Sequence, residues 1–203
     1  MKYEFGTAVV MVAILGAAGT ASAQAPAPTN QATAPAAVSV AVANPTYTSI
    51  VLETTVNRPA AEVWKRVGKY CDIGEWLRIA CTITAGKDGE VGAVRSVVNE
   101  VLVGKTELSY TYTQPVREGR PYNLYHGTLE ARPLTPTTSK LVYTLMWDNS
   151  MLADEAARER DRTQRTTQFT TALENMKILA EGGTLPPAPA RGGGAGGGRG
   201  RGN

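Results

Sequence analysis

The 203-residue chain has little of the chemistry on which most catalytic and metal sites depend. It contains one histidine, His126, and two cysteines, Cys71 and Cys81. These three side chains are too few and too unsuitably spaced for a typical zinc site, so we expect no metal and no other cofactor. A G-x-S-x-G nucleophile motif is also missing, and both cysteines lie far from His126 in the chain. The sequence therefore offers no recognisable nucleophile for His126 to activate.

The two ends of the chain have compositions that do not build a folded core. Residues 1–23 place Lys2 before an apolar run and end in Ala21-Ser22-Ala23, the order of a secretory signal peptide cleaved after Ala23. Glycines shorten the apolar run below the ~20 residues that span a bilayer, so we expect no stable membrane anchor. Residues 24–45 form an uncharged Ala- and Pro-rich spacer, and residues 183–203 form a Pro-, Gly- and Arg-rich tail, both expected to be disordered. The sequence thus predicts one secreted domain over residues 46–182, in the periplasm, with an extracellular location as the alternative.

This domain carries no excess of charge of either sign. Basic and acidic residues are equal in number over residues 46–182, and the tail contributes the net charge of +3 through Arg191, Arg199 and Arg201. A neutral domain provides no electrostatic attraction for nucleic acid. We therefore expect no nucleic-acid partner and interpret the tail arginines as a solvated end.

The middle of the chain consists mainly of short extended segments separated by turns. Strands are predicted at 47–56, 80–84, 93–98, 100–103, 108–114, 122–132 and 140–148, and short helices at 60–67 and 71–77. A long helix is predicted at about 154–181, with Phe169, Ala172, Leu173, Met176, Leu179 and Ala180 at helical spacing. No other predicted element has enough apolar length to cover a sheet face. The pattern predicts an α+β domain in which a curved antiparallel sheet of six or seven strands wraps around the last helix.

Five segments of the domain carry a recognisable pattern: NRPAAEVWKRVGKYCDIGEWL, VGAVRSVV, ELSYTYTQP, YNLYHGTLE and SKLVYTLMWD. Together they resemble the START-like, or SRPBCC, superfamily over about residues 47–182, and most closely its polyketide cyclase/dehydrase and lipid-transport branch. The resemblance implies a helix-grip fold with an internal cavity between the sheet and the last helix. It does not imply one function, because relatives include lipid carriers, hormone receptors, allergens, cyclases and hydrolase-like enzymes.

Alternation along the strands, combined with the resemblance, predicts which side chains face that cavity. Two strands each carry their bulky residues on one face, and the last helix adds an apolar floor; these residues are Leu108, Tyr110, Tyr112, Leu141, Tyr143, Leu145, Trp147, Phe169, Leu173 and Met176. The cavity is therefore expected to have apolar and phenolic walls.

Three further segments are placed by similarity to the hormone-receptor relatives. The alternation of NLYHGTLE is ambiguous by itself, and the similarity favours Leu124 and His126 facing inward. The same similarity puts Arg95 and Val97 inward on one strand and Glu100 inward on the next. Because a lone buried charge is unfavourable by several kcal/mol, we expect Arg95 and Glu100 to be paired or near the cavity mouth. Arg95 then either ties two strands together or holds a ligand carboxylate or phenolate.

The single histidine has three possible roles. His126 can line the cavity as a polar hook, bond to the sheet as a structural group, or act as a general acid or base, although a catalyst would need a partner to orient it. The hook is the interpretation that we favour.

The two cysteines lie ten positions apart and bracket Trp76. On an exported chain, Cys71 and Cys81 are expected to form a disulfide, which in the chain-entropy model stabilises the fold by about 3 kcal/mol.

Three functions remain open on the sequence alone. The favoured one is binding of a small hydrophobic or lipid-like molecule in the cavity, with tyrosines, His126 and Arg95 orienting it. The second is a cyclase- or hydratase-type enzyme with His126 as acid or base. The third is an interaction domain with a filled core.

Overall fold

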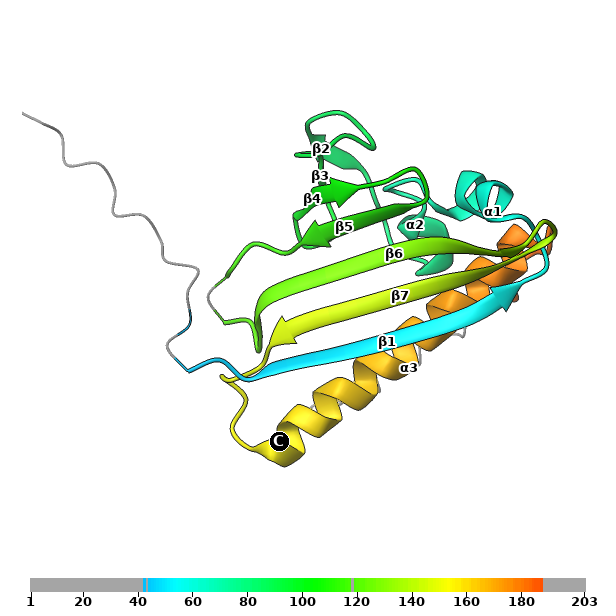
Figure 1. Cartoon of the computed structure of the whole chain (residues 1–203). Coiled ribbons are helices and arrows are strands. Elements are labelled where there is room, and N and C mark those ends of the chain that lie inside the picture. The colour runs from blue at the N-terminus through cyan, green and yellow to red at the C-terminus, as the bar shows by residue number, and fades with distance from the viewer. Residues whose placement is uncertain (1–41, 43, 118, 188–203) are drawn as a thin grey trace, which may run out of the picture. The chain divides into compact units, whose positions relative to one another are not determined.

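The computed structural model describes residues 42, 44–117 and 119–187 (Figure 1). The predicted signal peptide at 1–23, nearly all of the spacer at 24–45 and most of the tail at 183–203 lie outside these residues. The elements follow in the order β1 (Tyr47–Val56), α1 (Ala60–Val67), α2 (Ile73–Trp76), β2 (Ile83–Ala85), β3 (Val94–Arg95), β4 (Glu100–Lys105), β5 (Ser109–Thr113), β6 (Asn123–Thr135), β7 (Thr138–Asp148) and α3 (Glu155–Ala180). Among the described helices, none is long and apolar enough to cross a membrane.

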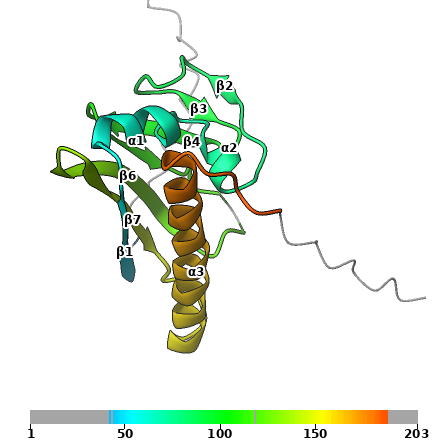
Figure 2. The same cartoon turned by 90° about the vertical axis from the view of Figure 1, so that its right-hand side faces the viewer.

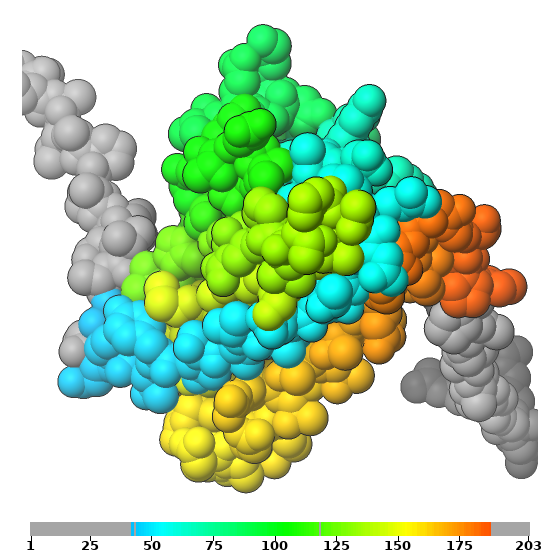
Figure 3. Space-filling view, turned by 45° about the vertical axis from the view of Figure 1, so that its right-hand side comes forward, coloured from blue at the N-terminus to red at the C-terminus, as the bar shows by residue number. Residues whose placement is uncertain are grey.

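The described strands form one antiparallel sheet of seven strands in the order β1-β7-β6-β5-β4-β3-β2. Strands β2 to β7 follow one another as a meander, and β1 joins the edge beside β7. Helix α3 lies along one face of this sheet, and α1 and α2 lie near the C-terminal end of α3 (Figure 2). The space-filling view shows β1 lying along α3 (Figure 3). This arrangement confirms the predicted α+β class.

Period-two burial identifies the face of the sheet that packs on α3. On β7 the buried inner residues include Leu141, Tyr143, Leu145 and Trp147, as the alternation predicted. On β6 the buried inner residues are Tyr125, Gly127, Leu129 and Ala131. Helix α3 meets this face with Phe169, Ala172, Leu173, Met176 and Leu179. The long helix is therefore the cover that the sheet required.

Strand β3 is shorter than the sequence predicted. The expected strand at 93–98 ends at Arg95, because Val98 and Asn99 adopt φ values of 54° each and turn the chain back into β4. A β-branched residue in the left-handed region is uncommon, and no glycine marks this turn in the sequence. The tight turn places Glu100 directly opposite Arg95.

The two ends of α3 are held by local contacts. Asp154 caps the helix N-terminus by accepting a hydrogen bond from the Ala157 amide at 2.7 Å. Beyond the helix, Leu185 packs partly against the core, and the Arg78 guanidinium donates to the Pro186 carbonyl. Residues 183–187 therefore continue to contact the domain.

We expect Gly127→Ala to destabilise the fold strongly. A Cβ at Gly127 would lie 2.3 Å from the Tyr112 Cζ atom, so the buried ring would have to move. Overpacking of this kind lowers the free energy of unfolding by about 1–3 kcal/mol. Gly104→Ala is the matched strand control, because the nearest heavy atom to its Cβ is 3.9 Å away. Urea denaturation would measure both, and equal losses in the two variants would contradict the close-packing argument.

Candidate ligand-binding site

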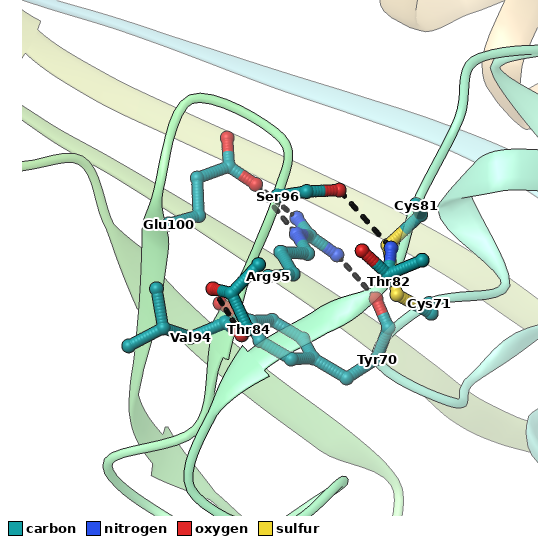
Figure 4. The surroundings of a disulfide bond; sticks show 9 residues. All are labelled: Tyr70, Cys71, Cys81, Thr82, Thr84, Val94, Arg95, Ser96 and Glu100. Carbon is teal, nitrogen blue, oxygen red and sulfur yellow. Dashed lines mark hydrogen bonds and ion pairs between the residues drawn. A yellow bond between two sulfur atoms is a disulfide. The ribbon is translucent and has the colours of Figure 1, made fainter.

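Arg95 lies at the centre of the most polar part of the interior. Its side chain is fully buried, and its Nε donates to Glu100 Oε2 at 2.6 Å while Nη1 donates to the Tyr70 carbonyl at 2.6 Å (Figure 4). The guanidinium carbon lies 4.3 Å from the centre of the Tyr70 ring and 4.7 Å from that of Tyr112. Hydrogen bonds and cation–π contacts together replace the water that this cation loses. The ion pair between neighbouring strands, one of the two roles considered for Arg95, is thus present in the structure.

Burial acts on both members of the pair. Burial alone disfavours the charged guanidinium, but Tyr110 and Glu100 keep the pKa of Arg95 above its ordinary value, so it remains charged. Burial raises the pKa of Glu100, although Arg95 and a hydrogen bond from Gln114 oppose this shift. The two charges therefore compensate each other, and removal of either side chain would leave a buried charge without a counter-ion.

A disulfide fixes the segment that supplies the Tyr70 carbonyl. Cys71 and Cys81 are bonded, with their Cα atoms 5.5 Å apart, which confirms the predicted bridge (Figure 4). The loop that they close contains α2, and the buried Trp76 is held through its carbonyl, which accepts from Asn175 of α3 at 2.9 Å. Because the bridge adjoins Tyr70, it restricts the backbone that contacts Arg95.

Polar contacts continue from Glu100 toward the other end of the sheet. Glu100 Oε1 accepts from Gln114 Nε2 at 2.8 Å, and the Gln114 side-chain oxygen accepts from the Tyr122 hydroxyl. The Tyr122 ring in turn lies 4.6 Å from the guanidinium carbon of Arg165 on α3. A row of interacting side chains thus links β3 to the long helix.

Arg165 occupies the space under the start of β6 and the end of β7. Its guanidinium carbon lies 5.1 Å from the ring centre of Tyr125 and 4.9 Å from that of Trp147. Asp161 neutralises it at 3.1 Å and also accepts from the Trp147 indole nitrogen at 2.9 Å. A cation enclosed by aromatic rings therefore fills this part of the interior.

The middle of the sheet is also closely packed against α3. The hydroxyls of Tyr112 and Tyr143 lie 3.0 Å apart, and the rings of Tyr143 and Phe169 have centres 4.7 Å apart. Burial raises the pKa of Tyr112 and Tyr143 well above the usual value for a phenol, so both remain neutral. Here side chains fill the position at which the resemblance implied an internal cavity.

An open groove lies between α1 and the β4–β5 hairpin. Its volume is ≈ 500 Å³, and its apolar lining comes from Trp64, Tyr70, Leu102 and Tyr110. The rest of the lining is glycine and polar residues: Lys65, Gly68, Lys69, Asp88, Gly89, Lys105, Thr106, Glu107 and Ser109. A volume of this size suits a small organic ligand. The Arg95 cluster lies directly against this apolar lining, because Tyr70 and Tyr110 belong to both.

Local packing shapes the aromatic wall of the groove. Gly68 follows α1, and a Cβ there would lie 2.4 Å from a ring carbon of Trp64, so only glycine allows the indole to lie over this position. Trp64 and Tyr110 have ring centres 5.6 Å apart, and Tyr70 meets Tyr110 edge-on at 5.5 Å. The hydroxyls of Tyr70 and Tyr110 are buried and have no hydrogen-bond partner of good geometry among the described residues.

The predicted site residues fall into two groups around this packing. One cluster joins Arg95, Glu100, Tyr110 and Tyr112, and a second joins Tyr143, Leu145, Phe169, Leu173 and Met176 beneath the sheet. Val97 and Leu108 are partly buried and pack against the core, Val97 from the β3–β4 turn rather than from a strand. The sequence patterns did not single out Trp64, Tyr70 or Leu102 as lining residues. Gly68, four residues after Trp64, is the sequence feature that could have indicated the aromatic wall of the groove.

The inward orientation predicted for Leu124 and His126 is wrong. Tyr125 and Gly127 occupy the inner face of β6, so His126 lies on the outer face beside Met146, its partner on β7. Leu124 has a φ of 47° in the irregular stretch between Asn123 and His126 and is half-buried. The alternation of this strand is ambiguous because Gly127 carries no side chain, and the similarity on which the inward orientation rested does not hold here. In the described part of the chain, no hydrogen bond or ion pair involves the His126 side chain.

The fold and this geometry can be compared with those of known proteins. A protein from Thermobifida fusca solved by NMR is 24% identical, and the match covers 68% of this chain and 97% of that one, with a TM-score of 0.55. A truncated norcoclaurine synthase from Thalictrum flavum is 13% identical over 71% of this chain and 99% of its own, with a TM-score of 0.54. The Zhui aromatase/cyclase from Streptomyces sp. R1128 is 16% identical over 68% and 100%, with a TM-score of 0.52.

The chain has the helix-grip fold. This confirms the resemblance to the START-like or SRPBCC superfamily at the level of the fold. No family model matches the sequence, and no curated protein matches it. Identities below 25% support the common fold and not a common activity.

We expect Glu100→Leu to lower the free energy of unfolding by about 3–5 kcal/mol, because it leaves the Arg95 charge buried without a counter-ion. The double variant Arg95→Met/Glu100→Leu removes both charges and should recover most of this loss. Urea denaturation of the two variants and the parent would measure the difference. A double variant as unstable as Glu100→Leu would contradict the view that charge compensation stabilises this cluster.

We expect His126 to make the fold less stable in acid. Burial lowers the pKa of His126 below its usual value of about 6.5, so the unfolded chain binds the proton more readily. The stability that the neutral ring contributes is present above pH 6.5 and is lost as the pH falls through the folded-state pKa. Thermal unfolding from pH 8 to pH 5 should therefore show a smaller fall in Tm for His126→Gln than for the parent. Parallel curves would show that His126 has no part in this dependence.

Proposed function

We propose that this domain binds a small, mostly apolar molecule in the groove between α1 and the β4–β5 hairpin. The observation that carries the proposal is the aromatic lining of an open groove of ≈ 500 Å³, formed by Trp64, Tyr70 and Tyr110. Apolar burial against such rings supplies affinity, at roughly 25 cal/mol per Å² of area removed from water. Most of the aromatic surface open to a ligand belongs to the half-buried Trp64, because Tyr70 and Tyr110 are only 1% and 3% exposed.

The fold agrees with this function. Two solved structures with the same fold are named as an aromatase/cyclase and as a norcoclaurine synthase, names that refer to small organic molecules. The groove differs in position from the sheet–helix cavity that the resemblance implied, because aromatic rings and Arg165 fill that space here. We therefore propose the edge where α1 faces β4 and β5 as the binding site.

We further propose that the protein works outside the cytoplasm, as the segment at 1–23 indicates. The Cys71–Cys81 disulfide supports this location, since such bonds persist in oxidising compartments and are rare in reducing ones.

A filled-core interaction domain is the second candidate, and the close packing of Tyr112, Tyr143 and Phe169 favours it. An acid–base enzyme dependent on His126 has no such support, because the imidazole lies on the outer face of the sheet, away from the groove and from the buried cluster. The binding experiment below separates the first two candidates.

The groove can be tested with N-phenyl-1-naphthylamine, a neutral apolar dye whose fluorescence rises on burial. We expect saturable binding to the parent protein, and at least tenfold weaker binding to Lys65→Trp, in which the indole fills the groove. Ala61→Trp is the matched control, because Ala61 is exposed on the same helix but does not line the groove. Absence of dye binding, or equal binding to all three proteins, would reject the groove and favour the filled-core domain.

A further inference from the structure

The two walls of the groove carry different charges. Helix α1 and the residues after it contribute Lys65 and Lys69 to the lining and no carboxylate. The opposite wall is mixed, with Asp88 from the β2–β3 loop and Lys105 and Glu107 from the β4–β5 hairpin. All five of these charged side chains are exposed. The helix side of the groove is therefore positive, in a domain that is neutral as a whole.

Two of the three lysines are free to meet a ligand. None of the ion pairs among residues 44–117 and 119–187 includes Lys65, Lys69 or Lys105. Lys105 Nζ donates to the Gly89 carbonyl at 2.6 Å, which holds it against the β2–β3 loop. Lys65 and Lys69 make no side-chain hydrogen bond to any described residue. The available cations are thus both on the helix wall.

A third cation lies behind the apolar lining. The buried Arg95 guanidinium is 4.3 Å from the ring centre of Tyr70 and 5.8 Å from that of Tyr110, and both rings line the groove. Glu100 balances most of this charge at short range. The phenol hydroxyls of Tyr70 and Tyr110 are buried donors without a partner of good geometry in the described chain. The polar groups that adjoin this aromatic lining therefore include a buried cation and, among the described residues, two hydroxyls without a partner.

From this arrangement we infer that the ligand is a free amphipathic anion, with an aromatic or aliphatic body against Trp64 and Tyr110 and one acidic group beside Lys65 and Lys69. The inference rests on the proposed function, since it assigns the ligand class of the same groove. Charge complementarity selects the acidic group, and the volume of ≈ 500 Å³ suits one small molecule. A carboxylate, sulfonate or phosphate group meets the same requirement.

The magnitude of the charge effect can be bounded. A unit charge about 4 Å from an exposed lysine raises affinity by roughly fivefold in water, before screening by salt. Exposed pairs seldom exceed about fivefold each. Two exposed lysines acting together should therefore favour an anionic ligand over its neutral counterpart by about tenfold at low salt.

Two dyes with the same aromatic body provide the test. The dye 8-anilinonaphthalene-1-sulfonate carries one negative charge, and N-phenyl-1-naphthylamine lacks it. We expect the full-length protein to bind the sulfonate about tenfold more tightly at 20 mM NaCl, with most of this preference lost at 500 mM. The double variant Lys65→Gln/Lys69→Gln should lower the ratio of sulfonate to neutral affinity about tenfold, whereas Glu107→Gln should raise it.

Control variants distinguish a failure of this inference from a failure of the proposed function. Lys140→Gln, on the outer face of the sheet where Lys140 pairs with Glu53, should leave the ratio unchanged. A ratio near one in the parent protein, or a ratio insensitive to Lys65→Gln/Lys69→Gln, would overturn the inference while neutral dye binding still supports the groove. An equal fall of the ratio in Lys140→Gln would also overturn it, because the anion would then respond to overall charge. Loss of neutral dye binding would instead reject the proposed function.

Discussion

The buried cation at Arg95 is the constraint around which the interior is arranged. A charge removed from water needs a counter-charge and further polar or aromatic contacts, and Arg95 obtains them from three separate segments of the chain. Glu100 reaches it only because the β3–β4 turn is tight, and the Tyr70 carbonyl only because the segment beside the Cys71–Cys81 bridge is held in place. The strand pairing, the β3–β4 turn and the disulfide therefore all position groups that contact one guanidinium.

The same requirement explains why the groove lies at the edge of the domain. Tyr70, Tyr110 and Tyr112 enclose Arg95, and the hydroxyl of Tyr112 extends the packing to Tyr143 and α3. Because these rings pack on the cation and on each other, aromatic side chains occupy the centre of this sheet face. Arg165 has the corresponding effect at the other end, between Tyr125 and Trp147. An open groove with an aromatic lining remains where α1 meets the β4–β5 hairpin.

The elements that dominate the fold were predictable because each has a long periodic pattern. The 26-residue helix α3 and strands β1 and β7 follow directly from apolar spacing, and their assembly into a helix-grip fold follows from the need to cover one face of the sheet. The disulfide was predictable from the spacing of two cysteines on a chain that the sequence predicts to be exported. The early end of β3 at Arg95 was not predictable, since the left-handed conformations of Val98 and Asn99 have no glycine to mark them.

The site was less predictable than the fold, for a reason that β6 makes clear. Both faces of the strand around His126 carry residues of mixed polarity, so its orientation depends on tertiary contacts, among them the Tyr112 ring close to Gly127. A period-two pattern changes face with a shift of one residue, and His126 moves from the interior to the outer surface with it. The groove involves the same kind of dependence, because Trp64 and Tyr70 flank Gly68 in sequence but meet Tyr110 only after α1 has docked on the sheet. The proposed function therefore depends on contacts between elements, which no local sequence pattern contains. The lysines of α1 point to a ligand only once the strands that form the opposite wall of the groove are known.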